Sequence, residues 1–302
     1  MRVTISLLAS ALLATVAAPA QTGAPQRTPG PDEQRTIDAD RTAPPPTATV
    51  RYGADALRSG ELRLPKGKGP FPVAILIHGG CFVAEMGGTG MQGFAEMLRA
   101  RGFATWDIDY RRVGHAGGGW PGSFEDVAAG VDYLPTLAKR YPLDLSRVTT
   151  VGHSAGALFA LWAASRPKLP APWTPRAGRP PIRSAVAIDG PGTLASLVGP
   201  DVQVCGKPVI VPLMGGTPAE RPKPYRIASA MDHLPLGVTQ LLVFSELGPF
   251  MQPYAARARA AGDPVLTLSP PNADHFDIVT RGTPNGEAVA DWVAANAFKT
   301  TR

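Results

Sequence analysis

Short, continuous apolar runs alternate with segments of helical periodicity along most of this 302-residue chain. The run at 73–77 is typical: five apolar residues end at a polar residue and two glycines. Such runs are characteristic of parallel strands buried on both faces, with helices forming the crossovers between them. The pattern predicts an α/β fold in which helices cover both faces of an open, mainly parallel sheet. Antiparallel edge strands are expected at 49–52 and 61–64, further strands at 103–108, 148–151, 184–188, 240–244 and 265–268, and helices at 91–101, 124–140, 155–164, 254–261 and 285–297.

The first 49 residues have a different composition. Residues 1–20 predict a signal peptide, because a basic start at Arg2 precedes an apolar stretch and a small-residue cleavage site. The stretch is shorter than the roughly 20 residues that span a bilayer, so we expect cleavage after Ala20 and a secreted or periplasmic protein. A retained membrane anchor is the alternative. Residues 21–49 are rich in proline and polar residues, which predicts a disordered linker.

The folded domain is therefore expected over residues 50–302. Its stretch at about 191–235 contains several prolines and no apolar run of strand length. This composition predicts an insertion that lies over one end of the sheet.

The segment Gly152-His153-Ser154-Ala155-Gly156 matches the G-x-S-x-G pattern. A glycine-rich chain contains such a pattern easily by chance, but here it joins a predicted buried strand to a predicted helix. A sharp turn at this place exposes the serine hydroxyl, and the two glycines leave room for the neighbouring backbone. We interpret Ser154 as a nucleophile. The alternative is a serine that only caps the helix.

A second motif, His78-Gly79-Gly80, follows the apolar run at 73–77. Glycines leave backbone N–H groups free to face a reacting carbonyl. Together with the N–H of Ala155, those of Gly79 and Gly80 are predicted to form an oxyanion hole. We interpret His78 as a residue that orders this loop.

These motifs together resemble the α/β-hydrolase superfamily, in its hormone-sensitive-lipase-like esterase and kynurenine-formamidase-like branch. Tyr110-Arg111 and Trp120-Pro121, followed by Glu125-Asp126-Val127, belong to the same resemblance, which covers about residues 51–297. It implies a three-layer α/β-hydrolase fold with a cap-like insertion, and a catalytic order of serine, acid and histidine. It also implies that His275, in the turn after the strand at 265–268, is the catalytic base.

The catalytic acid is where the chain departs from this family. The resemblance places an aspartate in the turn after the strand at 240–244, and Gly248 stands there instead. We predict that Glu246, two residues away, is the acid. Asp189, at the end of the strand at 184–188, is the alternative acid, and a third interpretation is that no triad acid exists.

The predicted function is that of an exported serine hydrolase, a carboxylesterase that cleaves small esters through an acyl-enzyme intermediate. One alternative is an arylformamidase, which cleaves an N-formyl amide with the same residues. Another is a catalytically impaired binding homologue, suggested by Gly248. The expected partner is a small ester or amide substrate, and the sequence does not indicate an oligomeric state.

The distribution of charge, histidine and cysteine residues indicates which other binding sites and cross-links to expect. The net charge of +6 comes from scattered basic residues, so no nucleic-acid surface is indicated. The histidines lack metal-ligand spacing and no phosphate loop is present, so we expect no metal and no other cofactor. In an oxidising compartment, a disulfide between Cys81 and Cys205 would fasten the insertion over the site; two separate buried thiols are the alternative.

Overall fold

The computed structural model describes residues 27–87 and 91–299. The predicted signal peptide, residues 1–20, lies outside these ranges and stays a prediction. Within them, no helix combines the length and the apolar character that crossing a membrane requires.

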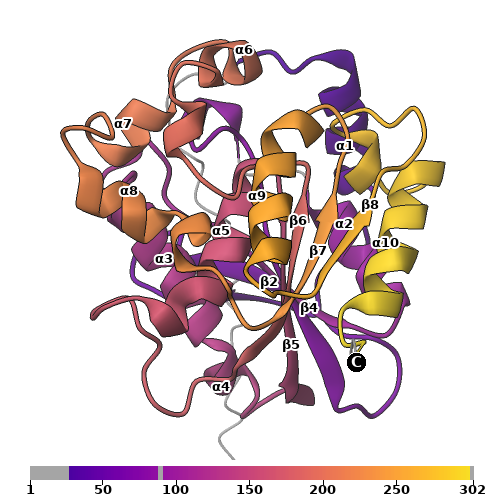
Figure 1. Ribbon diagram of the computed structural model, residues 1–302. Helices are drawn as coiled ribbons and strands as arrows, with labels where there is room; N and C mark the ends of the chain where they lie inside the picture. The colour runs from indigo at the N-terminus through magenta and orange to yellow at the C-terminus, as the bar shows by residue number, and fades with distance from the viewer. Residues whose placement is uncertain (1–26, 88–90, 300–302) are drawn as a thin grey trace, which may run out of the picture.

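An eight-stranded sheet forms the centre of the molecule, in the order β1-β2-β4-β3-β5-β6-β7-β8 (Figure 1). β2 pairs antiparallel with β1 and with β4, whereas every pairing from β4 to β8 is parallel. The prediction of a mainly parallel sheet with an antiparallel edge is confirmed. The strands are β1 Ala48–Arg51, β2 Ser59–Arg63, β3 Phe71–Ile77, β4 Ala104–Ile108, β5 Leu143–His153, β6 Ile182–Ile188, β7 Thr239–Val243 and β8 Val265–Leu268.

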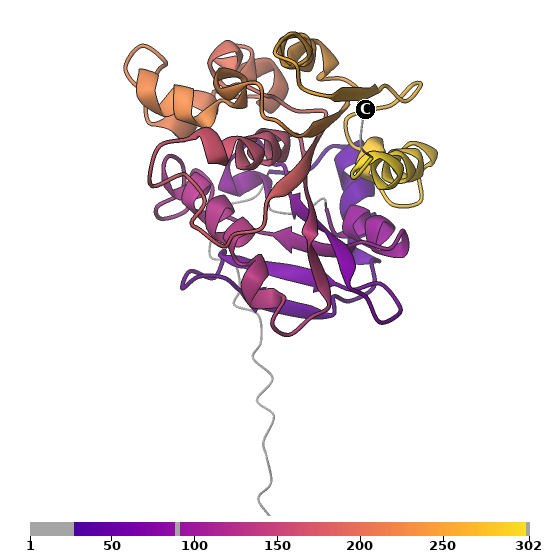
Figure 2. The same ribbon diagram turned by 60° about the horizontal axis from the view of Figure 1, so that its bottom comes forward.

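Helices cover both faces of this sheet, as Figure 2 shows. α2 (Gln92–Ala100) and α10 (Pro284–Asn296) pack on one face, against apolar side chains of β3, β5, β6 and β7. α3 (Gly122–Asp132), α5 (Ala155–Ser165) and α9 (Gly248–Ala260) cover the other face. Every residue of α5 is buried, which explains why its sequence is apolar all round instead of amphipathic.

The helix expected at 124–140 is divided in two. α3 ends at Asp132, and a short helix, α4 (Leu134–Leu137), follows with Pro135 in its first turn. Proline is tolerated in a first turn, where its missing N–H has no intrahelical acceptor, but not within a continuous helix. Pro135 therefore marks the start of a new helix.

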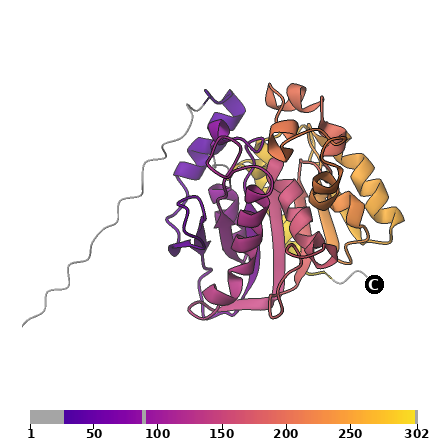
Figure 3. The same ribbon diagram turned by 90° about the vertical axis from the view of Figure 1, so that its left-hand side faces the viewer.

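The insertion at 191–235 lies over the end of the sheet at which Ser154 is found (Figures 1 and 3). It is built from short helices and contains no strand, as predicted. A disulfide between Cys81 and Cys205 ties it to the loop after β3, so of the two possibilities that the sequence leaves open, the bonded pair is the one found. The helices of the insertion are α6 Asp201–Cys205, α7 Ile210–Met214, α8 Pro222–Ala228, and the 3₁₀ turns η3 Ala195–Leu197 and η4 Ala230–His233. The other 3₁₀ turns are η1 Ala84–Met86, η2 Arg166–Lys168 and η5 Asp277–Val279.

The prediction of a disordered linker at 21–49 is wrong for much of its described part. Residues 31–41 form a helix, α1 (Pro31–Arg41), which packs beside α2, and β1 already begins at Ala48. Helix α1 is held by buried polar contacts. The hydroxyls of Thr36 and Thr280 lie 2.5 Å apart, and Asp40 accepts a hydrogen bond from the N–H of Gly93 at 2.6 Å.

The prediction failed because it considered only the burial of apolar side chains, and a segment can also be ordered by hydrogen bonds. Helix α1 has few apolar residues and is ordered by hydrogen bonds to the domain instead. A start signal for it is nevertheless present, because Pro31 stands at the first helical position and Asp32 and Glu33 follow in the first turn.

Candidate active site

Ser154 lies at the turn between β5 and α5, with φ 55° and ψ −122°. A non-glycine residue rarely adopts this conformation, which stores backbone strain. A Cβ atom on Gly152 would lie 2.0 Å from the carbonyl oxygen of Gly156, and one on Gly156 would lie 1.9 Å from that of Ile77. Both positions therefore require glycine. The side chain of Ser154 makes no capping hydrogen bond to α5, so the helix-cap interpretation is wrong.

His275 lies between β8 and η5 and contacts Asp189. Its Nδ1 is 2.7 Å from Oδ2 of Asp189, whose side chain is fully buried at the end of β6. Glu246 lines the same cleft but makes no hydrogen bond or ion pair with His275. The prediction that Glu246 is the carboxylate at His275 is thus corrected: the alternative residue, Asp189, occupies that place.

The turn after β7 explains why the acid has moved. α9 begins at Gly248, and the turn before it supplies hydrogen-bond donors instead of a carboxylate. The N–H and hydroxyl of Ser245 donate to Asp189 at 2.8 and 2.5 Å, and the N–H of Leu247 donates at 3.1 Å. Burial by itself would raise the pKa of Asp189, but the hydrogen bonds from His275 and Ser245 outweigh it and lower this pKa. Asp189 is therefore ionised beside His275.

His153, which precedes the serine, also holds His275. Its Nε2 lies 2.8 Å from the carbonyl oxygen of His275, and the two rings have centroids 4.5 Å apart. Burial, together with the charge of His275, lowers the pKa of His153 to about 3. His153 is thus neutral at ordinary pH and donates to that carbonyl. Its position inside the serine motif gives no signal of this contact.

Helix α1 holds the same turn from the opposite side. Nη2 of Arg35 lies 2.7 Å from Oδ2 of Asp274, the residue before His275. Oδ1 of Asp274 accepts the N–H groups of Phe276 and Asp277, at 2.8 and 2.7 Å. Burial would raise the pKa of Asp274, but these backbone bonds and the Arg35 guanidinium lower it. The conformation of the histidine turn is therefore fixed partly by a residue outside the predicted domain.

The glycines after β3 lie against the serine turn. A Cβ on Gly79 would be 2.9 Å from Cβ of Ser154, so the two backbones approach as closely as glycine permits. His78 accounts for the order of this loop, since its Nδ1 lies 2.8 Å from the carbonyl oxygen of Gly79 and its ring stacks on that of Tyr110. Ala155 is the first residue of α5, where N–H groups have no intrahelical acceptor.

Two hollows meet at Ser154. A cleft of about 570 Å³ contains Gly79, Gly80, Ser154 and His275, and its outer walls come from α1 and α6. A much smaller apolar pocket, of about 40 Å³, lies beside Ser154 and Ala155 under the insertion. Within residues 27–87 and 91–299, no three histidine, cysteine or acidic side chains gather as metal ligands would.

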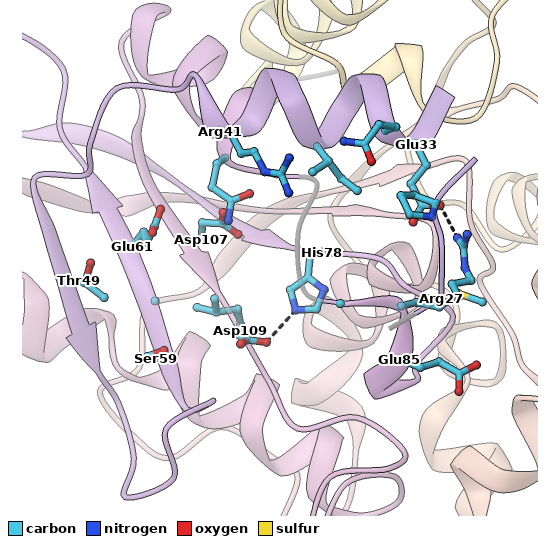
Figure 4. Close-up of a pocket in the computed structure, with 18 residues that line it drawn as sticks. Arg27, Glu33, Arg41, Thr49, Ser59, Glu61, His78, Glu85, Asp107 and Asp109 are labelled. Atoms are coloured by element: carbon cyan, nitrogen blue, oxygen red, sulfur yellow. Dashed lines mark hydrogen bonds and ion pairs between the residues drawn. The ribbon is translucent and has the colours of Figure 1, made fainter. Parts of the chain in front are cut away.

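A polar cavity of about 370 Å³ adjoins the cleft, and both are lined by Arg27, Glu33, Ile37 and Met86 (Figure 4). Arg27 and Glu33 form an ion pair there. Asp107 of β4 lies in this cavity with only 8% of its surface exposed. It stands directly opposite Glu61 of β2, and its carboxylate makes no hydrogen bond or ion pair with any described residue. Burial, reinforced by the charge of Glu61, raises the pKa of Asp107.

This raised pKa gives a test by pH. When the pKa of a carboxyl group is higher in the folded than in the unfolded state, the stability of the protein falls as pH rises. The fall begins at the unfolded pKa, about 3.9, and ends above the folded pKa. Asp107→Asn removes the charge and is expected to raise the free energy of unfolding by about 1–2 kcal/mol at pH 8, with little effect at pH 4. Denaturant unfolding at the two pH values measures this difference.

Asp144→Asn is the matched control for that experiment. Hydrogen bonds from Ser146 and Arg147 lower the pKa of Asp144, so the same change there should reduce stability at pH 8 instead of raising it. A loss of stability at pH 8 in Asp107→Asn would contradict the expected strain at this carboxylate.

Several solved structures that share this fold are esterases. A carbohydrate esterase from gut microbiota is 19% identical, with a TM-score of 0.66 over 84% of this chain and 97% of its own. Esterase B of Lactobacillus rhamnosis, solved with a tributyrin phosphonate inhibitor, is 17% identical, with a TM-score of 0.69 over 87% and 90%. The hyperthermophilic esterase of the archaeon Pyrobaculum calidifontis is 17% identical, with a TM-score of 0.66 over 88% and 90%.

These likenesses confirm the predicted α/β-hydrolase fold, and esterases are the enzyme class that the motifs predict. No curated protein matches the chain at a significant level. The model of the BD-FAE family matches residues 61–244, which is more than half of the chain. With the serine turn after β5 and the glycine loop after β3 on the sheet of an α/β-hydrolase, this chain belongs to the BD-FAE family.

Proposed function

We propose that this protein is a serine hydrolase that cleaves small carboxylic esters through an acyl-enzyme intermediate. The observation that carries the proposal is that Ser154, on its strained turn, and His275 line one cleft. The buried carboxylate of Asp189 holds His275 there, with 2.7 Å between Nδ1 and Oδ2. The family and the esterases of the same fold support it, among them esterase B with its phosphonate inhibitor.

The first half of the reaction forms the acyl-enzyme. Oγ of Ser154 attacks the ester carbonyl carbon, Nε2 of His275 takes the serine proton, and the carbonyl electron pair moves onto oxygen. The N–H groups of Gly79, Gly80 and Ala155 stabilise this oxyanion. His275 then gives its proton to the alcohol oxygen as the bond between carbon and that oxygen breaks.

The second half repeats these steps with water in place of the serine. His275 takes a proton from water, the hydroxide attacks the acyl carbon, and the proton returns to Oγ of Ser154 as the acid leaves. Throughout, Asp189 accepts the Nδ1–H of His275, which keeps the base nitrogen directed toward the reacting atoms. A buried, ionised Asp189 also stabilises the imidazolium that forms in each half.

The two alternatives are affected differently by this geometry. The impaired homologue was suggested by Gly248 at the acid position, and Asp189 now supplies the carboxylate that was missing. The arylformamidase alternative requires the same residues. A parallel assay with an N-formyl amide therefore distinguishes it from the esterase.

A fluorophosphonate probe and p-nitrophenyl acetate test the proposal together. We expect the wild type to be labelled on the peptide that contains Ser154 and to hydrolyse the ester. Ser154→Ala should lose the label and about 10⁵-fold or more in kcat. Ser146→Ala, at an exposed serine of the same strand, should behave as the wild type does. A wild-type protein that neither labels nor turns over would refute the esterase.

We also propose that the protein is exported, to the periplasm or the medium. The apolar stretch after Arg2 and the cleavage site at Ala20 support this. The Cys81–Cys205 disulfide supports it independently, because structural disulfides persist in oxidising compartments.

A further inference from the structure

Of the two hollows that meet at Ser154, only one is lined by His275. His275 lines the cleft of about 570 Å³ but not the pocket of about 40 Å³. Both are lined by Ser154, Cys81 and Cys205, so the disulfide stands at the boundary between them. The small pocket has Ala155, the first residue of α5, in its wall.

This difference assigns a direction to the bound ester. The histidine must reach the leaving alcohol oxygen to protonate it, so the alcohol lies on the His275 side of the serine. The substituent on the other side of the carbonyl carbon is the acyl chain. It points away from His275, toward the small pocket. This pocket is lined by apolar side chains, including Phe82, Leu197, Val204, Ile210 and Phe250.

We propose that the small pocket receives the acyl chain, restricts the enzyme to short aliphatic acyl groups, and owes its outer wall to the Cys81–Cys205 disulfide. The proposal rests on the proposed esterase function. It adds which side of Ser154 selects the acyl group and which residues set the limit.

The volume of the small pocket limits the length of the acyl chain that it can hold. A water molecule needs about 10–15 Å³ of such space, so about 40 Å³ holds roughly three atoms of water size. This is room for the carbons of an acetyl to butyryl group. A longer acyl chain enters only if the lining moves, and helix α6 supplies three of the lining residues, Asp201, Val204 and Cys205.

Helix α6 has five residues, too few for a helix that is stable without outside contacts. At its first residue, the carboxylate of Asp201 accepts the N–H groups of Val209 and Ile210, at 2.8 and 2.9 Å. At its last residue, Cys205 is bonded to Cys81 in the loop after β3. Asp201 ties α6 only to the insertion itself, whereas the disulfide ties it across the pocket to the domain.

Adjacent valines on α6 provide a matched pair of variants. Val204 lines the pocket and the adjoining cleft, whereas Val202 lines neither, although both side chains are exposed, by 37% and 43%. We measure kcat/KM for p-nitrophenyl acetate, butyrate, hexanoate and octanoate. In the wild type, kcat/KM is expected to fall at least about tenfold from butyrate to octanoate. Val204→Ala should raise the octanoate-to-butyrate ratio about fivefold or more, and Val202→Ala should leave it unchanged. A wild-type ratio in Val204→Ala would show that this pocket does not take the acyl chain.

The double variant Cys81→Ser/Cys205→Ser tests the disulfide. We expect its octanoate-to-butyrate ratio to rise as that of Val204→Ala does. If the folded double variant keeps the wild-type ratio, the disulfide does not hold the wall. Should the variant fail to fold, wild-type protein reduced with a phosphine and alkylated gives the same comparison. Failure of the wild type on every ester and with the fluorophosphonate would instead refute the proposed function.

Discussion

Asp189→Asn is expected to lower kcat for p-nitrophenyl acetate by about 10⁴-fold, because asparagine cannot fix the Nδ1–H tautomer of His275 or stabilise its imidazolium. Asparagine can occupy the same position, 2.7 Å from Nδ1 of His275, but it carries no negative charge. Steady-state kinetics measure the effect, and KM should change far less than kcat. Circular dichroism confirms that the variant is folded.

Glu246→Gln is the control for this variant. Glu246 lines the same cleft as His275 without contacting it, so the same loss of charge there should alter kcat by no more than about threefold. Equal losses in the two variants would remove Asp189 from the triad. A larger loss in Glu246→Gln would restore the acid that the sequence favours.

Gly156→Ala is expected to lower the free energy of unfolding by more than about 3 kcal/mol, or to prevent folding. The added Cβ would lie 1.9 Å from the carbonyl oxygen of Ile77 and 2.8 Å from that of His78. Both atoms belong to the backbone at the end of β3, so neither can turn aside as a side chain does. Relief of this clash would separate β3 from α5. Denaturant unfolding followed by fluorescence measures the change.

Gly30→Ala is the matched substitution, because a Cβ at Gly30 meets no atom within 4 Å. Because Gly30 is the N-cap of α1, where alanine is less favourable than glycine, the free energy of unfolding should fall by no more than about 1 kcal/mol. If Gly156→Ala proved equally mild, the close approach of α5 to β3 would not be required for the fold.

The sheet was predictable because burial on both faces leaves a direct mark on the sequence. The runs at 73–77 and 184–188 contain almost only apolar residues, and both are buried strands. The place of Ser154 was predictable for a related reason, because its glycine-flanked motif joins a buried strand to a helix. His275 followed from the order of catalytic residues in the family that the chain resembles.

The acid could not be predicted with the same means. Its place depends on how the turn after β7 enters α9, a difference of a residue or two that periodicity does not resolve. In the structure, the N–H groups of Ser245 and Leu247 in this turn donate hydrogen bonds to Asp189, which follows the preceding strand, β6. The contact of His153 with His275 and the ordering of α1 could not be predicted for another reason. Hydrogen bonds made by single polar residues leave no periodic pattern in the sequence.

Helix α1 changes where the working unit of this protein begins. A polypeptide that started at residue 50, the boundary indicated by composition, would lack one wall of the substrate cleft. It would also leave Asp274 without its guanidinium partner and the buried hydroxyl of Thr280 without Thr36, with only the carbonyl oxygen of Phe276 as its partner. Asp274 directly precedes His275. Truncations intended to simplify the protein, and grafts of this fold onto other leaders, should therefore keep the segment from residue 27 onward as part of the enzyme.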